Sequence, residues 1–407
     1  MIGLENKRIA LLFPFALVLY EIAIYLSHDM YLPALPIIAR DFHASETIAQ
    51  DTLLAWFLGS ASMQLLTGPL SDRFGRKTIV LTGGVFFVLS TFICAFTDHA
   101  MTMIIARFIQ GSTVCSVVVA GYAAIHELFD TKAAIKIIAI MGSVTILAPT
   151  IGPLFGAVII EMAHWRAVFY FLAIWAIINL LFLFFIMPET NRIKIPLNLG
   201  SIIKDYIAIT KNKSFMFYTV PYCLLFLSLI CWLVESPFVI IETYQKGMIE
   251  FGLIQLIVFS GFSLGALATG VWVQKTNPLR LVAIGLIISF IASLILIISS
   301  FFISHLYWFV VLMTVISFGS AMAFAPLNRC AVESCQQPMG RIMAIFAFYM
   351  NIFGVIATWL VTLFHDHAMD DLSILIALGI VIAFLIFFGL KKGLVKSQGK
   401  VSENVIR

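Results

Sequence analysis

The sequence contains few charged residues. Asp, Glu, Lys and Arg make up 11% of its 407 residues, whereas 61% are apolar, and a soluble domain carries about 25% charged residues. Because a membrane-spanning helix needs about 20 apolar residues, about a dozen spans would leave roughly 155 positions for tails and connections. The composition therefore indicates a membrane protein without a soluble catalytic domain, and we do not expect an enzyme.

The sequence also lacks signatures of nucleic-acid, metal and nucleotide binding. Its 25 basic and 21 acidic residues give a net charge of +4, which is too small and too dispersed for a nucleic-acid partner. The segment GRKT (75–78) lacks the upstream glycine of a phosphate-binding loop. The six cysteines include no CxxC pair, and we expect them to be reduced packing residues: Cys94, Cys115, Cys223, Cys231, Cys330 and Cys335. We therefore expect no metal and no cofactor, and an ion gradient as the energy source.

The apolar residues fall into long runs bounded by charges or turn residues. The first run follows a basic start and continues to about Leu32 without a small-residue cleavage site, which indicates a first span rather than a signal peptide. We predict twelve spans, near 11–32, 49–70, 78–96, 101–123, 137–161, 165–187, 215–240, 251–273, 281–302, 307–328, 342–364 and 372–390. The predicted fold is an all-α integral membrane protein.

The spans form two sets of six, separated by a polar connection. We predict an N-terminal six-helix bundle (1–187), a linker (188–214), a C-terminal six-helix bundle (215–390) and a tail (391–407). Such a plan suggests two bundles related by an axis along the membrane normal, with a site between them.

The basic residues predict the orientation, because Lys and Arg accumulate in cytoplasmic loops. Of the 25 basic residues, all but Arg40, Arg107, Arg166 and Lys246 fall in segments on the side of the N-terminus. Both termini, the linker and the tail are therefore predicted to be cytoplasmic.

The segment GPLSDRFGRK (68–77) matches the loop signature of the major facilitator superfamily, which the chain resembles. The resemblance implies the family's fold of 12 transmembrane helices in two six-helix bundles. A glycine at 68 permits close helix packing and a glycine at 75 a tight turn, and Asp72 could pair with a basic group or helix N-terminus of the neighbouring bundle. We expect a conformational latch, with a merely basic topogenic loop as the alternative. Its residues are Gly68, Asp72, Arg73, Gly75 and Arg76.

A second motif, APTIGPLFG (148–156), lies in the fifth predicted span and follows Gly142. It resembles the motif that distinguishes antiporters of the superfamily from its symporters. Prolines remove backbone donors and glycines leave a flat face, so we expect this helix to bend and to pack against a neighbour from the other bundle. Packing alone is the alternative. The matching residues are Gly142, Ala148, Pro149, Gly152 and Pro153.

Two carboxylates lie in the first predicted span. Glu21 and Asp29 are separated by about 12 Å along a helix and about 80° around it, with Tyr25 between them. Ionisable groups at membrane depth are costly and usually mark a pathway. Since loss of water favours the neutral form of a carboxyl, either residue could carry a proton. The alternative places Asp29 at a wet external mouth and gives Glu21 a structural partner.

The fourth predicted span contains a permanent cation, Arg107, in the segment RFIQG. A buried guanidinium must find acceptors, which could be backbone carbonyls or a carboxylate of the first span. If its partner changes with protonation, it couples the proton to conformation, and Gln110 could orient it. A purely structural arginine is the alternative.

The resemblance narrows at LLFPFALVLYE, YLSHDM, RFIQG and GYAAIHE, which together are similar to multidrug/proton antiporters of the MdfA type. This resemblance implies a multi-pass protein of the bacterial inner membrane. It also implies that Glu21 and Asp29 serve protonation and substrate, and that Arg107 belongs to the proton-coupling motif. The sequence departs from that type at His28, where a small amide is usual, and at Glu235, an extra acid in the seventh predicted span.

Several further residues are candidates for substrate contact. Tyr25, Tyr122 and Trp232 could stack on lipophilic drugs, although most aromatic residues must face lipid or pack between helices. Gln110 is a polar candidate. Glu235, near the outer end of its span, could attract cations or simply be wet.

These observations favour a proton-coupled exporter of lipophilic cationic and neutral drugs that works by alternating access. Its expected partners are a small-molecule substrate, protons and the lipid bilayer, and a monomer is the default. The alternative within transport is a dedicated proton-coupled exporter of a native metabolite, such as a siderophore or small polar compound. A receptor or passive channel is a further alternative, whereas an integral-membrane enzyme would need a catalytic constellation that we do not find.

Overall fold

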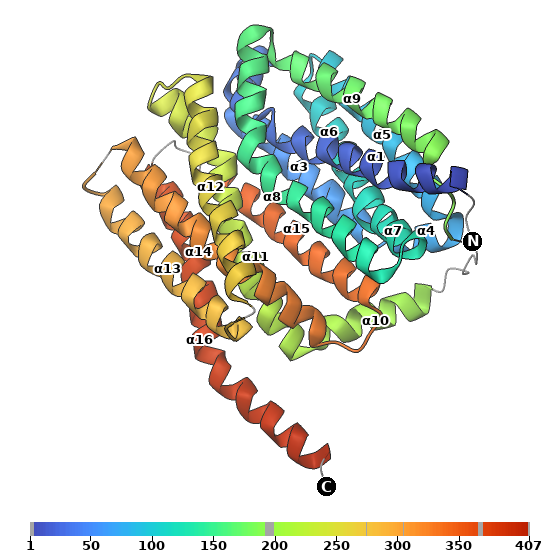
Figure 1. Cartoon of the computed structure of the whole chain (residues 1–407). Coiled ribbons are helices and arrows are strands. Elements are labelled where there is room, and N and C mark those ends of the chain that lie inside the picture. The colour runs from blue at the N-terminus through green and yellow to red at the C-terminus, as the bar shows by residue number, and fades with distance from the viewer. Residues whose placement is uncertain (1–3, 192–198, 274, 304, 365–368, 406–407) are drawn as a thin grey trace.

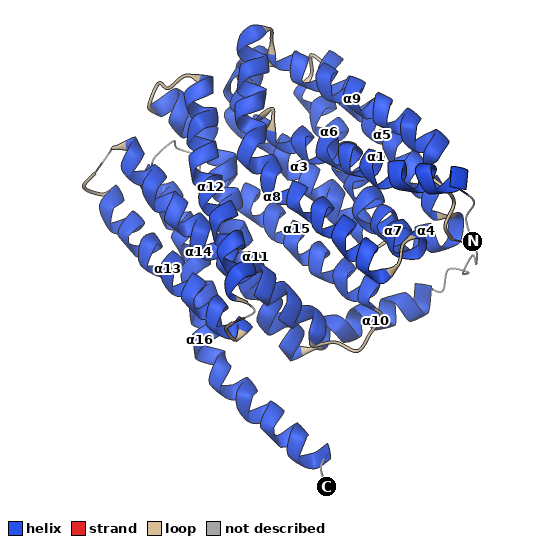
Figure 2. Cartoon of the chain, in the orientation of Figure 1, coloured by secondary structure: helices blue, strands red, loops and turns tan. Residues whose placement is uncertain are grey.

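The structure is a computed structural model that describes residues 4–191, 199–273, 275–303, 305–364 and 369–405. Residues 192–198 of the predicted linker and the last two residues of the predicted tail lie outside these ranges. Throughout the described part of the chain, the regular elements are helices (Figures 1 and 2).

The first half of the chain contains α1 to α9 and two short elements, the 3-10 helix η1 and the π-helical segment η2. Their bounds are α1 Leu4–Asp29, η1 Leu32–Ala34, α2 Leu35–Asp41, α3 Glu46–Gln64, α4 Thr67–Phe74, α5 Arg76–Phe96, α6 Ala100–Cys115, η2 Ser116–Gly121, α7 Tyr122–Leu128, α8 Thr131–Met162 and α9 Trp165–Ile186.

The second half contains α10 to α16 and a second π-helical segment, η3. The bounds are α10 Leu199–Lys211, α11 Lys213–Pro237, η3 Phe238–Thr243, α12 Met248–Trp272, α13 Pro278–Ser300, α14 Leu306–Glu333, α15 Met339–Leu363 and α16 Met369–Val405. Helix α10 lies within the predicted linker.

The helices agree with the predicted spans, because each of the twelve lies on helical backbone. Among the described residues, ten helical segments are long and apolar enough to cross a membrane, and α3 with α4, bent by 51°, makes an eleventh. Helix α8 carries the shorter apolar stretch Leu147–Met162. The fold is thus that of an all-α multi-pass membrane protein. The helix α16 continues beyond the predicted span end at 390, and its last part projects from the other helices (Figure 1).

The helices form two groups, one from each half of the chain, and the two groups pack against each other. In the first half, α1 packs against α8 and α9, α5 against α6 and α9, and α3 against α6. In the second half, α11 packs against α14, α15 and α16, and α13 against α14 and α16. The groups meet mainly where α3 contacts α15 and where α8 contacts α12 (Figure 1), and η1 makes smaller contacts with α11 and α12. This arrangement places α1, which carries both predicted carboxylates, beside one of the helices that meet the second group.

Small residues allow the two groups to approach. A Cβ atom on Gly252 of α12 would lie 3.1 Å from the Leu154 side chain of α8, and one on Gly354 of α15 would lie 2.8 Å from the Phe57 ring of α3. Phe57 also packs edge-on against Phe226 of α11, with ring centroids 6.1 Å apart. In a membrane, such close packing holds helices together because the lipid provides no hydrophobic driving force between them.

Candidate functional site

Glu21 is fully buried in α1. The hydroxyl of Tyr122 donates a hydrogen bond of 2.9 Å to its Oε1 atom, whereas Oε2 has no hydrogen-bond partner among the described residues. Tyr122 is the first residue of α7, directly after the π-helical segment η2. A π-helical turn carries an extra residue and often occurs at functional sites. The first-span carboxylate and a predicted substrate aromatic are therefore in direct contact.

Asp29 is the last residue of α1 and is also buried. Its Oδ1 atom lies 2.8 Å from Nδ1 of His28. The interpretation of Asp29 as a residue at a wet mouth is wrong, because its side chain is only 6% exposed. Tyr25 is partly buried and lies within electrostatic range of both Glu21 and Asp29.

Arg107 is fully buried in α6. Its Nη1 atom donates a hydrogen bond of 2.9 Å to the backbone carbonyl of Ser27 and another to Oε1 of Gln110. The guanidinium also lies over the Tyr31 ring, 4.3 Å from its centroid, which adds a cation–π attraction. The first-span acceptor of Arg107 is therefore a backbone carbonyl, one of the two alternatives the sequence left open.

The polar contacts of Arg107 continue to α5. Nε2 of Gln110 donates a hydrogen bond of 2.7 Å to the hydroxyl of Thr91, which supports the predicted orienting role of this amide. Nε and Nη2 of Arg107 have no partner among the described residues. The structure thus leaves two donors of this buried guanidinium unpaired beside α1, in the part of the chain that it describes.

The second half contributes a different polar cluster. The Trp232 indole donates a hydrogen bond of 3.0 Å to Gln255, whose amide donates one of 2.6 Å to Ser236. Glu235 is 4% exposed, and its Oε2 atom accepts a hydrogen bond of 2.7 Å from Gln50 of α3. The interpretation of Glu235 as simply wet is therefore wrong, and this acid links the two halves of the chain.

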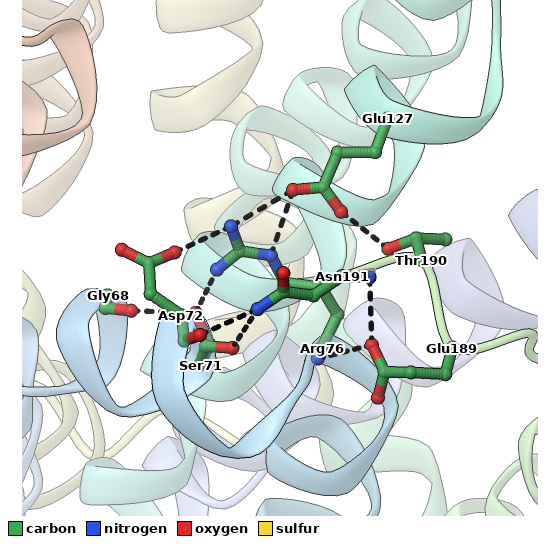
Figure 3. A network of polar contacts seen from close by, with 8 residues as sticks. All are labelled: Gly68, Ser71, Asp72, Arg76, Glu127, Glu189, Thr190 and Asn191. Atoms are coloured by element: carbon green, nitrogen blue, oxygen red, sulfur yellow. Dashed lines mark hydrogen bonds and ion pairs between the residues drawn. The ribbon is translucent and has the colours of Figure 1, made fainter. Parts of the chain in front are cut away.

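The turn between α4 and α5 is the centre of a larger polar network (Figure 3). Nη2 of Arg76 lies 2.6 Å from Oδ1 of Asp72 and 3.0 Å from Oε1 of Glu127 at the end of α7. The segment after α9 closes the network from the other side: Thr190 donates to Glu127, and the backbone N–H of Arg76 donates to Glu189. Three segments of the first half are therefore tied together at one point.

The expected partner of Asp72 was in the neighbouring bundle, but the ion pair lies within the first half, with Arg76. The physical reason is proximity, since the two residues are four positions apart across a tight turn. Gly75 forms that turn with a φ of 106°, as predicted. Among the described residues, a Cβ at Gly68 would meet only the Val119 side chain, at 3.7 Å, so the close helix packing expected at this glycine is not found there. Arg73 lies over the Phe74 ring.

The glycines of the α8 motif face α1 rather than the other bundle. A Cβ on Gly152 would lie 2.8 Å from the Cβ of Asp29, and one on Gly156 would overlap the carbonyl of Met30. The reason is helical periodicity: residues 152 and 156 share a face, whereas Leu154, which contacts Gly252 of α12, lies on the opposite side. Pro149 and Pro153 lie inside the helix.

The remaining motif positions are less constrained. Ala148 is buried, whereas a Cβ on Gly142 would meet no atom of the described residues within 4 Å. Among the described residues, there is also no cluster of three His, Cys, Asp or Glu side chains that could hold a metal ion.

Comparisons with known proteins agree with this architecture. The model of the Major Facilitator Superfamily matches residues 17–358. Three curated proteins are similar over most of their length. The chloramphenicol resistance protein CraA of Acinetobacter baumannii is 32% identical over 88% of both chains. The multidrug transporter MdfA of Yersinia pestis is 31% identical over 93% of this chain and 95% of its own. The multidrug resistance protein MdtM of Escherichia coli is 29% identical over 92% of both.

Two solved structures share the fold at low sequence identity. A bacterial homologue of the human lysosomal transporter Spinster, in an inward-facing and unoccupied conformation, has a TM-score of 0.73 at 13% identity and covers 97% of this chain and 98% of its own. A D-xylose-proton symporter has a TM-score of 0.72 at 16% identity and covers 92% and 96%.

Proposed function

The chain belongs to the major facilitator superfamily, and from this premise we propose that it exports lipophilic cationic and neutral drugs in exchange for protons. The names of relatives that cover about nine-tenths of the chain support this proposal. The observation that carries it is the buried polar cluster of α1 and α6. Glu21 has an unpaired oxygen, and Arg107 has unpaired donors and a backbone acceptor in α1, in the part of the chain that the structure describes.

The proposed cycle uses the first-span carboxylates as proton carriers. A proton from the external side neutralises Glu21 or Asp29 and is released inside as a substrate enters. One charge that crosses 100 mV contributes about 2.3 kcal/mol, and one pH unit adds about 1.4 kcal/mol. Together these terms support a concentration gradient of about 500-fold per proton.

Arg107 is proposed to couple the proton to conformation. Its guanidinium holds the Ser27 carbonyl, between the positions of Glu21 and Asp29. A deprotonated carboxylate attracts the unused guanidinium donors, whereas a neutral carboxyl does not. Protonation of a first-span carboxylate would therefore shift the guanidinium between a position paired with that carboxylate and a position unpaired with it. Tyr25, Tyr122, Gln110, Trp232 and Glu235 are the proposed substrate contacts, and the turn around Asp72 and Arg76 is the proposed latch.

The proposal includes a topology. Both termini lie in the cytoplasm of a bacterium, the linker 188–214 joins two six-helix bundles on that side, and the transporter works as a monomer without catalysing a chemical reaction. The distribution of basic residues supports this orientation.

Exchange in liposomes tests the proposal. Purified protein is reconstituted with a pH-sensitive dye inside, and tetraphenylphosphonium or chloramphenicol is added under a proton gradient. We expect both compounds to drive proton movement, and the double variant Glu21→Gln/Asp29→Asn to be silent. Wild-type exchange by the double variant would refute the carboxylate assignment.

A susceptibility panel in an efflux-deficient host tests the substrate class. Protection against lipophilic cations and a phenicol supports drug export. Proton exchange without protection against any such compound would instead favour a dedicated exporter of a native metabolite, such as a siderophore or small polar compound.

A further inference from the structure

The polar pair at the end of α1 includes a second proton acceptor. Nδ1 of His28 and Oδ1 of Asp29 are 2.8 Å apart, and the two side chains are 8% and 6% exposed. We propose that His28 is a proton-binding residue of the transport cycle, and that a cationic substrate displaces its proton. This inference rests on the proposed function and adds a histidine to the two carboxylates that it uses as proton carriers.

The chemistry of the pair favours the imidazole as the proton carrier. In water, an imidazole binds a proton about 400-fold more tightly than an aspartate carboxylate. When Nδ1–H is donated to Asp29, the tautomer is fixed and the lone pair of Nε2 becomes the basic site. This atom is buried and has no hydrogen-bond partner among the described residues. A proton on Nε2 gives an ion pair with Asp29 instead of an isolated buried charge.

The ring of His28 lies in an aromatic layer contributed by α3. Its centroid is 4.6 Å from the ring of Trp56 and 5.1 Å from that of Phe57. Nε1 of Trp56 is likewise buried without a partner among the described residues. An unpaired donor and an unpaired acceptor in one layer indicate contact with a polar ligand or water, because buried polar atoms are normally hydrogen-bonded.

This layer also lies where the two halves of the chain meet. Phe57 packs against Phe226 of α11, and a Cβ on Gly354 of α15 would crowd the same Phe57 ring. A movement of one half against the other therefore changes the surroundings of the pair. This is the property that a proton site needs for alternating access.

Among the described residues, few charged groups contact this part of α1, and the titratable side chain of Tyr25 lies within electrostatic range of Asp29. Asp29 is in direct contact, and Arg107 binds the carbonyl of Ser27, the residue before His28. The neighbouring residues of α3, Trp56 and Phe57, are uncharged. Helix α8 contributes Gly152 beside Asp29. The second half contributes Phe226 and Gly354, which contact Phe57. The last turn of a helix also favours a cation. The pair therefore carries a charge of −1 when His28 is neutral and zero when it is protonated.

The proposed step exchanges one proton for one cation. The Nε2–H bond of the imidazolium breaks, the proton passes to water, and its electron pair stays on Nε2. The pair then has a negative charge that attracts the cation. Reprotonation of Nε2 from the other side of the membrane restores the neutral pair and weakens cation binding.

Proton release on substrate binding tests this step. Tetraphenylphosphonium is added to purified protein in weakly buffered detergent, and released protons and affinity are measured between pH 5.5 and 8. In the wild type, displacement of one proton should tighten binding by up to about tenfold per pH unit below the midpoint. We expect His28→Asn to reduce the number of protons released per bound cation and to weaken the pH dependence to that of the carboxylates alone.

A matched control comes from a second histidine–aspartate pair among the described residues. Nε2 of His164 lies 3.4 Å from Oδ2 of Asp41, but this histidine side chain is 52% exposed. His164→Asn should leave proton release and the pH profile unchanged. A wild-type pH profile in His28→Asn would overturn the proposal.

A second measurement needs neither substrate nor a stable asparagine variant. Nitrogen-15 NMR of histidine-labelled wild-type protein, assigned with His28→Asn or His28→Gln, reports protonation at each ring nitrogen. We expect Nε2 of His28 to gain a proton between pH 8 and 5 while Nδ1 keeps its own. A ring that stays neutral over this range would refute the proton site. If Nε2 titrates but no drug is transported, the export proposal fails and the proton site stands.

Discussion

Gln50 donates a hydrogen bond of 2.7 Å from its Nε2 atom to Oε2 of Glu235, and this contact joins α3 to α11 between residues 185 positions apart. Both residues are buried: the exposed fraction is 0% for Gln50 and 4% for Glu235. A carboxylate that accepts an amide N–H in a low-dielectric environment makes a stronger hydrogen bond than a neutral pair. The contact therefore holds the two halves together at this layer.

The first prediction concerns this bond. Gln50→Ala and Glu235→Ala should each lower the free energy of unfolding in detergent, because each leaves the other side chain without this partner. A double-mutant cycle should give a coupling energy of about 1–3 kcal/mol. Additive effects of the two substitutions would show that the bond contributes nothing to stability.

The second prediction concerns Arg107. Lysine cannot hold the Ser27 carbonyl and the Gln110 amide while it also covers the Tyr31 ring, because an ammonium lacks the planar fork of a guanidinium. We expect Arg107→Lys to reduce the rate of drug/proton exchange by about 10- to 100-fold. This is the change in rate that corresponds to the free energy of one hydrogen bond made by a charged group.

Arg329 provides the control for this substitution. It forms an exposed ion pair with Glu333, so Arg329→Lys should exchange at the wild-type rate. Equal rates for Arg107→Lys and the wild type at equal protein amounts would show that the buried arginine has no role in coupling.

The third prediction separates charge from hydrogen bonding at Glu21. Glu21→Gln keeps an oxygen that can accept from Tyr122 but removes the negative charge. At an effective dielectric constant of 20, a carboxylate attracts a cation 4 Å away by about 4 kcal/mol. Exchange of tetraphenylphosphonium should therefore fall by about tenfold or more, and exchange of neutral chloramphenicol by much less. Tyr122→Phe, which keeps the charge, should retain cation exchange; equal losses for both substrates in Glu21→Gln would contradict the electrostatic role.

The fourth prediction compares two glycines of α8. A Cβ on Gly156 would overlap the backbone carbonyl of Met30, which cannot move without a shift of α1, whereas a Cβ on Gly142 would meet no atom of the described residues within 4 Å. Gly156→Ala should lower the apparent melting temperature in detergent by several degrees and abolish exchange. Gly142→Ala should be neutral or slightly stabilising, since alanine favours a helix by up to about 1 kcal/mol. Equal melting temperatures for the two variants would contradict the close contact of α8 with α1.

The fifth prediction separates two costs at Gly75. A Cβ there would collide with the Glu189 carboxylate, and a φ of 106° is unfavourable for any L side chain. We expect Gly75→Ala to lower the free energy of unfolding by about 1–3 kcal/mol. In the Glu189→Ala background, the same substitution should cost less but still destabilise, because only the collision is relieved. An unchanged cost in that background would show that Glu189 does not crowd the turn.

The sequence predicted the helices because a span is a local property of about 20 apolar residues. It also singled out Glu21, Asp29 and Arg107, all of which are buried, because an ionisable residue in an apolar run stands out from its neighbours. Contacts between distant segments were not accessible in this way. The acceptor of Arg107 is the backbone of Ser27, which no side-chain motif marks, and the face of Gly152 depends on which helix packs beside it.

The π-helical segment η2, Ser116–Gly121, determines how helix α7, which follows it directly, is rotated about its axis. A single-residue deletion that restored regular α-helix there would rotate the next turn by about 100°. Two separate contacts would be lost together: the hydroxyl of Tyr122 would leave Glu21, and the carboxylate of Glu127 would leave Arg76. One extra residue thus aligns the membrane carboxylate and the distant turn at Arg76 on the same short helix.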